Sequence, residues 1–124
     1  MKKHIILTLI LICSVQILIA QQKTSSVMKM LVKHTWTKSH EQLGTITLAF
    51  KTDSTYTVAG IPNDTIKGVF SLKSDVFTFE HENSCSSKGI YTITVTDETL
   101  NFITKEDNCD GRNMITPGIW NASK

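Results

Sequence analysis

The chain lacks several features that would point to a common class of protein. After Val32, no segment has both the length and the helical periodicity of a helix that covers a sheet. No glycine-rich loop of the kind that holds phosphates is present. The charges nearly balance, with 13 Lys and Arg residues against 11 Asp and Glu residues, and they form no basic patch. These absences argue against a helix-covered sheet, a phosphate-binding loop and a nucleic-acid-binding surface.

The first twenty residues have the composition of a secretory signal peptide. Lys2 and Lys3 give a positive start, residues 5–12 are almost wholly apolar, and the small residue Ala20 ends the apolar stretch. We expect residues 1–20 to be a signal peptide cleaved after Ala20, and the protein to be secreted or periplasmic. The alternative is a retained anchor, because the apolar stretch approaches the ~20 residues that a membrane span needs.

Cysteine is scarce, and removal of residues 1–20 leaves only Cys85 and Cys109. An even number of cysteines in an exported chain predicts a disulfide, rather than a reactive thiol or a metal site. Both cysteines flank a predicted hairpin, whose alternating runs at residues 90–95 and 100–104 surround a turn at residues 96–99. Because the outer ends of a hairpin meet, the cysteines can meet as well. Such a bond contributes roughly 3 kcal/mol to stability in a chain-entropy treatment.

The rest of the chain predicts an all-β domain at residues 31–124, after a polar leader at residues 21–30. Residues 27–32 form either one helical turn or the approach to a strand. The segments with strand-like alternation are residues 45–50, 55–58, 66–72, 77–80, 90–95, 100–104 and 113–120, with residues 35–39 as a possible eighth. Without a covering helix, short turns between consecutive strands favour an up-and-down antiparallel meander that closes into a barrel of about eight short strands.

Several weak motifs occur in an order that resembles small secreted bacterial domains of the lipocalin-like (calycin-type) family. The motifs are Trp36 at the first strand, an aromatic strand after a turn at residues 50–56, Gly68-Val-Phe70, Cys85 with Gly89-Ile-Tyr91, and Cys109-Asp-Gly-Arg112 before Trp120. The chain departs from the family because His34 and Thr35 replace the usual glycine motif before Trp36. Arg112 precedes the last strand instead of ending it, so the family's arginine role is not transferred to it.

An eight-stranded meander places alternate loops at the same end of the barrel. The loops that hold Cys85 and Cys109 would then share one mouth. Trp36 would open the first strand and Trp120 would end the last strand, so we expect both tryptophans to close the opposite end together.

The resemblance implies a small hydrophobic or amphipathic ligand within the barrel. The cavity-lining residues that it suggests are Phe50, Tyr56, Phe70, Phe77, Phe79, Tyr91 and Phe102, together with Ile46, Leu48, Val58, Leu72, Ile93 and Leu100. An eight-stranded barrel is equally able to fill its interior with side chains. The alternative is therefore a filled barrel that acts as a protein-interaction or inhibitor-like module through loops 61–66 and 82–88.

Metal binding has weak support in the sequence. Glu80, His81 and Glu82 are consecutive, and on a strand His81 faces away from its two neighbours. We interpret these residues, with Asp107 and Asp110, as solvated charges at the rim of the barrel. The expectation is no metal site and no cofactor.

Catalysis has even less support. Ser84 and Ser86 lie near His81 in the sequence, but no orienting acid and no oxyanion donor can be identified. We expect no enzyme activity and no catalytic residue. We also expect a monomer with no nucleic-acid partner and no stable membrane span after signal cleavage.

Overall fold

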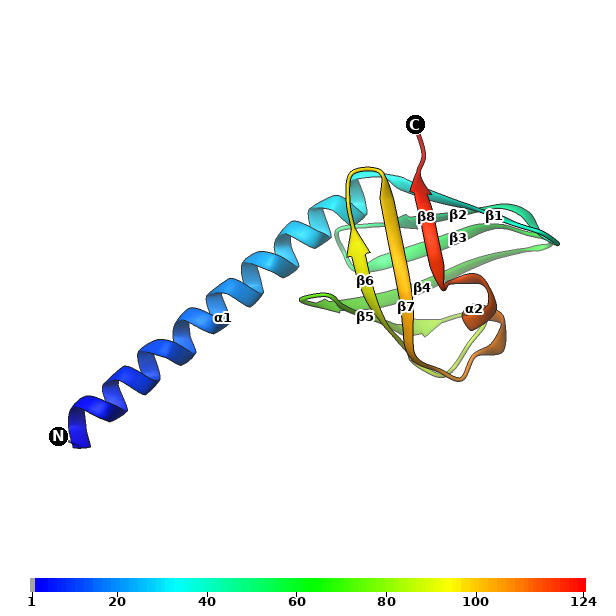
Figure 1. The fold of residues 1–124 in the computed structure, drawn as a ribbon. Coiled ribbons are helices and arrows are strands. Elements are labelled where there is room, and N and C mark those ends of the chain that lie inside the picture. The colour runs from blue at the N-terminus through cyan, green and yellow to red at the C-terminus, as the bar shows by residue number, and fades with distance from the viewer. Residues whose placement is uncertain (1) are drawn as a thin grey trace.

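A computed structural model describes the backbone of residues 2–124 and the side chains of residues 14–124. Eight antiparallel strands follow one another in sequence order, and β8 pairs with β1 to close the barrel (Figure 1). The elements are α1 (Lys2–Lys33), β1 (Thr35–His40), β2 (Gly44–Phe50), β3 (Thr55–Ile61), β4 (Asp64–Lys73), β5 (Val76–Glu82), β6 (Gly89–Val95), β7 (Thr99–Asp107), α2 (Asp110–Ile115) and β8 (Gly118–Ala122). The predicted up-and-down barrel is confirmed, with residues 35–40 as its eighth strand.

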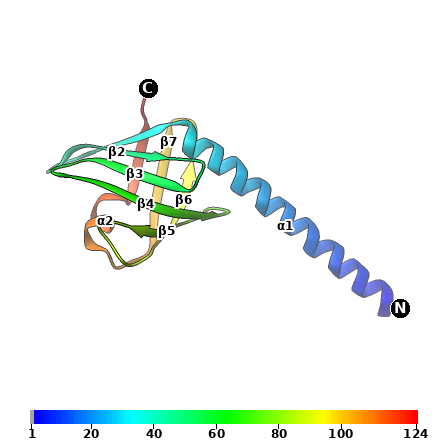
Figure 2. The ribbon, with the colours of Figure 1, turned by 180° about the vertical axis from the view of Figure 1, so that it is seen from behind.

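The two ends of the barrel are easily told apart. Helix α1 projects from one end, which also carries the β2–β3, β4–β5 and β6–β7 turns (Figures 1 and 2). We call this the helix end. The other end carries the β1–β2, β3–β4 and β5–β6 connections and α2. We call it the disulfide end, because Cys85 and Cys109 lie there.

Helix α1 runs without a break into the barrel. Its last turns bring Val27, Met28, Leu31 and Val32 against the core, and Leu31 is fully buried. This spacing puts the four side chains on one helix face. Residues 21–30, which we expected to be a polar leader, are therefore helical, and the short window at residues 27–32 proves to be helix.

The predicted signal peptide lies largely on residues 1–13, whose side chains are outside the described part of the structure. Its cleavage after Ala20 therefore stays a prediction. Among the described residues, no helix combines the length and the apolar character that a membrane span requires.

Aromatic side chains fill the barrel toward the helix end. Their six rings contact one another at centroid distances from 4.8 Å to 6.0 Å, mostly edge to face, with Phe70 and Phe77 stacked at 5.0 Å. The cluster consists of Phe50, Phe70, Phe77, Phe79, Tyr91 and Phe102. Trp36 is fully buried and donates from its Nε1 to the Leu31 carbonyl at 3.0 Å, which joins α1 to the barrel.

The last strand is present, but its predicted bounds of residues 113–120 are wrong. Residues 110–115 form the short helix α2, and β8 begins only at Gly118, where φ is +100°. Since β8 starts late, Trp120 lies in the middle of the strand, opposite Leu100. Trp120 borders a cavity at the disulfide end, so the expectation that both tryptophans close the helix end holds for Trp36 alone.

Candidate functional site

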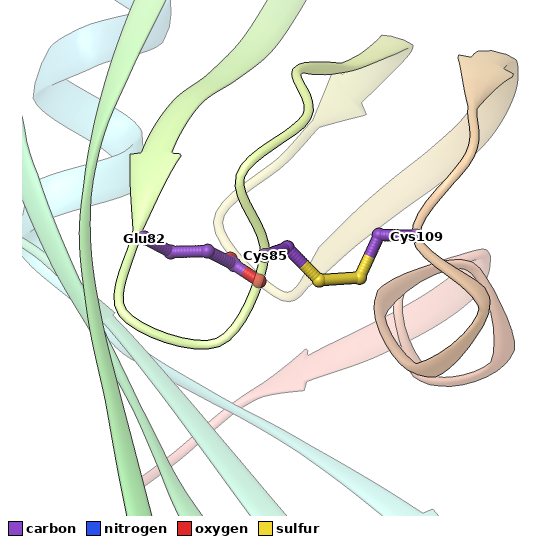
Figure 3. Close-up of side chains that lie close together, drawn as sticks. All are labelled: Glu82, Cys85 and Cys109. Atoms are coloured by element: carbon purple, nitrogen blue, oxygen red, sulfur yellow. A yellow bond between two sulfur atoms is a disulfide. The ribbon is translucent and has the colours of Figure 1, made fainter.

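The predicted disulfide is confirmed. Cys85 lies in the β5–β6 loop and Cys109 immediately precedes α2, with 6.1 Å between their Cα atoms (Figure 3). Both cysteines are at one mouth of the barrel, as the meander predicted. The bond ties α2 to the β5–β6 loop across this mouth.

A cavity of about 320 Å³ lies beneath the disulfide. Its wall is mainly apolar, and a few polar groups lie among the apolar side chains. The lining residues are Leu48, Tyr56, Val58, Ile61, Asp64, Ile66, Phe79, Glu82, Ser84, Cys85, Cys109, Gly111, Arg112, Ile115, Thr116 and Trp120. The cavity therefore occupies the disulfide end, between α2 and strands β2 to β5.

Of the seven aromatic residues predicted to line a cavity, Tyr56 and Phe79 border this one. The other five are equally buried but pack against one another in the aromatic cluster: Phe50, Phe70, Phe77, Tyr91 and Phe102. The barrel is thus filled at the helix end and hollow at the disulfide end, which combines the two alternatives that the sequence left open.

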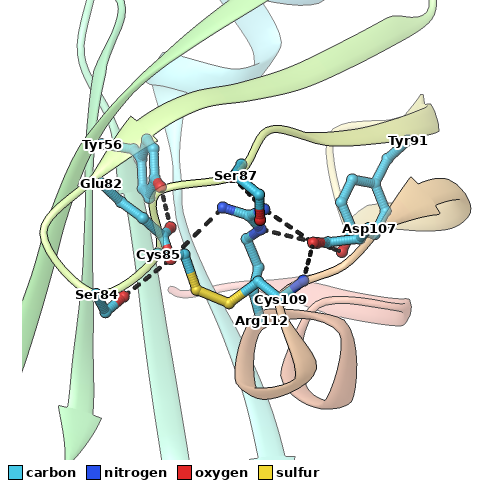
Figure 4. The surroundings of a disulfide bond; sticks show 9 residues. All are labelled: Tyr56, Glu82, Ser84, Cys85, Ser87, Tyr91, Asp107, Cys109 and Arg112. Carbon is cyan, nitrogen blue, oxygen red and sulfur yellow. Dashed lines mark hydrogen bonds and ion pairs between the residues drawn. A yellow bond between two sulfur atoms is a disulfide. The ribbon is translucent and has the colours of Figure 1, made fainter.

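Arg112 on α2 is the centre of a buried polar network (Figure 4). Its guanidinium donates from Nε to Asp107 Oδ2 at 2.7 Å and from Nη2 to Asp107 Oδ1 at 2.8 Å. Nη2 also donates to the Ser87 carbonyl at 2.8 Å, and the guanidinium lies 5.4 Å from the Phe79 ring centroid. This is a bidentate pair on an aromatic ring, which arginine forms and lysine does not.

Glu82 lies on the other side of the same guanidinium. Tyr56 Oη donates to Glu82 Oε2, and Ser84 Oγ donates to Glu82 Oε1 at 2.9 Å. The nearest Arg112 nitrogen, Nη1, is 3.6 Å from Glu82 Oε1, which is an ion pair beyond hydrogen-bond distance. Nη1 is buried and makes no hydrogen bond to any described residue.

Two one-residue bulges turn the acidic side chains inward. On β5, His81 pairs with Val69 and Phe79 pairs with Phe70, so Glu80 is left over. On β7, Glu106 pairs with Ile90 and Thr104 pairs with Tyr91, so Lys105 is left over. Each extra residue reverses the inward–outward alternation beyond it and re-aims the next side chains.

The bulges explain why the interpretation of Glu82 and Asp107 as solvated rim charges is wrong. Phe77 and Phe79 point into the barrel, so regular alternation would point His81 inward as well. Because of the bulge, Glu82 points inward instead and His81 is exposed. The side chains of Glu82 and Asp107 are 2% and 0% exposed. The bulged strands β5 and β7 themselves contain no glycine or proline, so neither strand offers a local signal for its bulge.

Two glycines make room for this network. A Cβ atom on Gly68 would lie 2.6 Å from the Tyr56 hydroxyl, and one on Gly89 would lie 2.5 Å from Asp107 Oδ2. Gly68 lies opposite Glu82, beside the β5 bulge, and its lack of a side chain also admits the Tyr56 ring. Both positions require glycine because another residue would overlap the polar groups.

Burial and hydrogen bonds within the network shift the pKa values of Asp107, Tyr56 and Tyr91. Burial raises the pKa of Asp107, but hydrogen bonds from Arg112 and Tyr91 outweigh burial and hold it below its usual value. Burial and a hydrogen bond to a carboxylate raise the pKa of Tyr56 and Tyr91 far above that of a free tyrosine. Both hydroxyls therefore keep their protons and act as donors to Glu82 and Asp107.

The residues considered for metal binding do not converge. Glu80 pairs with Lys88 at 2.8 Å and accepts from Ser71, while His81 and Asp110 are exposed. Glu82 does lie near both cysteines, with the three potential ligand atoms within 4.8 Å of one another (Figure 3). The two sulfur atoms are joined in the disulfide, however, and metal ions bind the free thiolate.

Of the two serines considered for catalysis, Ser86 is exposed and Ser84 has another partner. Ser84 Oγ donates to Glu82, and the exposed His81 points out of the barrel. Ser84 is thus part of the polar network and is not oriented by His81.

Fold and site together define a class: a small closed barrel with one filled end and one cavity that has a buried polar base. Comparison with known proteins gives no match to a family model, to a curated protein or to a solved structure.

Proposed function

We propose that this protein is an exported, lipocalin-like binder that takes a small hydrophobic or amphipathic molecule into the cavity at the disulfide end. The observation that carries the proposal is the cavity itself. Its volume of about 320 Å³ lies at the lower end of the range for small-molecule sites. Apolar walls with a few convergent polar groups are typical of such sites.

Export is supported by the disulfide. Disulfides persist in oxidising compartments, which fits the signal-peptide-like start of the chain. The hydrogen bonds that the polar side chains already make with one another support a binding role over a catalytic one. Asp107, Tyr91, Tyr56 and Ser84 each already make a hydrogen bond within the network.

A protein-interaction module is the second candidate. Ile103 and Ile119 are more than half exposed on the adjacent strands β7 and β8, and Met114 of α2 is exposed to the same degree. Apolar side chains on an outer face are common in monomers and mark contact surfaces only when they form a large patch. The cavity therefore carries more of the argument.

A first test is native mass spectrometry of the protein purified from its own secretory route. We expect a small molecule that is retained under native conditions and released on denaturation. A protein mass two hydrogens below the reduced value reports the disulfide in the same spectrum.

A second test uses a hydrophobic fluorescent probe, N-phenylnaphthylamine, with the purified protein. We expect the probe to bind the wild type and Val58→Phe, which fills the cavity wall, to weaken it by at least about tenfold. Ile103→Phe makes a similar enlargement on the outer face and should leave binding unchanged. Equal binding by both variants would show that the probe does not occupy the cavity and would contradict the proposed function.

A further inference from the structure

The polar base of the cavity also selects the ligand's headgroup, an inference that rests on the proposed function. We infer that the ligand is a neutral amphiphile with a hydroxyl headgroup, which accepts a hydrogen bond from Arg112 Nη1 and donates one to Glu82 Oε1. Carboxylic acids and amines are the two chemical classes that this base disfavours.

The first argument is the free donor. Arg112 has five N–H groups, and three contacts to Asp107 and Ser87 use those on Nε and Nη2. Nη1 makes no hydrogen bond, although the side chain is only 4% exposed. A buried donor without a partner is costly, so an acceptor atom that reaches it gains more than an ordinary hydrogen bond.

The second argument is the neighbouring acceptor. Glu82 Oε1 accepts from Ser84 Oγ, and a carboxylate oxygen has capacity for a further hydrogen bond. The 3.6 Å between Nη1 and Oε1 is too long for a direct hydrogen bond. A hydroxyl is both an acceptor and a donor, so a small shift of these side chains lets one hydroxyl satisfy both groups.

The third argument is charge. One guanidinium faces two buried carboxylates, Asp107 and Glu82, which leaves a formal excess of one negative charge at the base. A ligand carboxylate beside Glu82 would meet that excess at low dielectric, where like charges repel strongly. An ammonium group has no lone pair to accept from Nη1, and it would lie against the guanidinium.

The experiment compares three ligands with the same alkyl chain: n-octanol, octanoate and octylammonium. Each competes with N-phenylnaphthylamine for the disulfide-intact protein at neutral pH. We expect n-octanol to compete at concentrations at least about tenfold lower than either charged ligand. A free alcohol also enters any apolar cavity more readily than an ion does, so the wild type alone does not test the headgroup.

The decisive variant is Glu82→Gln, which removes the excess charge while its amide oxygen still accepts from Tyr56. We expect Glu82→Gln to strengthen octanoate binding by about tenfold, because the excess charge is gone. It should weaken n-octanol binding by about three- to tenfold, because an amide nitrogen then stands where Oε1 accepted from the ligand hydroxyl. Glu106→Gln makes the same change of charge on an exposed position of β7 and should alter neither ligand. Thermal unfolding of both variants confirms that each is folded at the assay temperature.

The outcomes separate the two proposals. An octanol-to-octanoate ratio that is the same in wild type and Glu82→Gln would overturn the headgroup inference, and the binding function would stand. Tightest binding by octylammonium would also overturn the headgroup inference, because the excess negative charge, and not the free donor on Arg112, would then determine which headgroup binds best. If neither the probe nor any octyl ligand binds the wild type, the proposed function fails and the inference fails with it.

Discussion

The two ends of this barrel differ in the kinds of side chain that they bury. At the helix end, packed aromatic rings and Trp36 fill the interior of the barrel, and the last turn of α1 covers them. At the disulfide end, a guanidinium, two carboxylates and two phenols hold the base of a cavity open. Buried apolar area stabilises the first end, whereas the second depends on hydrogen bonds and ion pairs among buried polar groups. The comparison assigns most of the stability to one half of the domain and the proposed ligand binding to the other.

The largest expected effect comes from the filled end. Phe77 contacts Phe50, Phe70, Phe79 and Phe102 and is fully buried. Phe77→Ala should lower the free energy of unfolding by about 3 to 5 kcal/mol, because it leaves a void that the neighbouring rings cannot close. Urea denaturation measures the change.

Binding should respond differently, because Phe77 does not line the cavity. At a temperature where Phe77→Ala is folded, N-phenylnaphthylamine should bind it within about twofold of wild type. A tenfold loss of probe affinity would show that the two halves are coupled.

The disulfide gives the next largest effect. The double variant Cys85→Ser, Cys109→Ser should lose about 3 kcal/mol of stability and keep its sheet. Probe binding should weaken as well, since the bond holds α2, and with it Arg112, over the cavity. Denaturation curves and probe titrations measure both effects.

The fluorescence of Trp120 reports on the cavity when the disulfide is removed. It borders the cavity, whereas Trp36 lies under α1, so a Trp36→Phe background leaves Trp120 as the reporter. Loss of the disulfide should shift Trp120 emission. Two reactive thiols in protein purified from the periplasm would contradict the disulfide itself.

The smallest of the three effects is a dependence on acid. The folded state holds the pKa of Asp107 below its usual value, so in acid the unfolded state binds the proton first. The stability due to Asp107 is therefore complete above about pH 4 to 5 and is lost as pH falls through the lowered pKa. Asp107→Asn should cost about 1.5 to 3 kcal/mol at neutral pH and flatten the acid side of the stability curve.

Glu106→Gln is the matched control for this prediction, because Glu106 precedes Asp107 on β7 and is exposed. It should leave the neutral-pH stability within about 0.5 kcal/mol of wild type. An Asp107→Asn curve with the same acid slope as wild type would mean that other carboxylates account for the acid sensitivity.

Much of the fold was predictable from local patterns. Period-two alternation gave the strands, and an even number of cysteines around a hairpin gave the disulfide. Helix α2 was not predicted because six residues are too few for periodicity to distinguish a helix from a strand. The helix at residues 21–30 was not predicted because most of these residues are polar, and the apolar face at Val27, Met28 and Leu31 is short.

The polar base could not be predicted from the same patterns. Its residues come from β3, β5, β6, β7 and α2, and two bulges without a sequence signal turn Glu82 and Asp107 inward. Arg112 was placed just before the last strand and was given no partner, whereas helix α2 brings its side chain to Asp107. Strand alternation therefore predicts the aromatic half well, and it fails where the ladder is interrupted.

The placement of the chain termini has a practical consequence. Helix α1 enters the barrel at the helix end, and β8 leaves it there too, where the Ser123 amide donates to the Thr35 carbonyl at 2.7 Å (Figure 1). The cavity opens at the opposite pole. A tether on either terminus, such as the link to a sensor chip, would thus leave the disulfide end facing away from the surface. A ligand bound as proposed would therefore enter on the side of the domain that faces away from the attachment point.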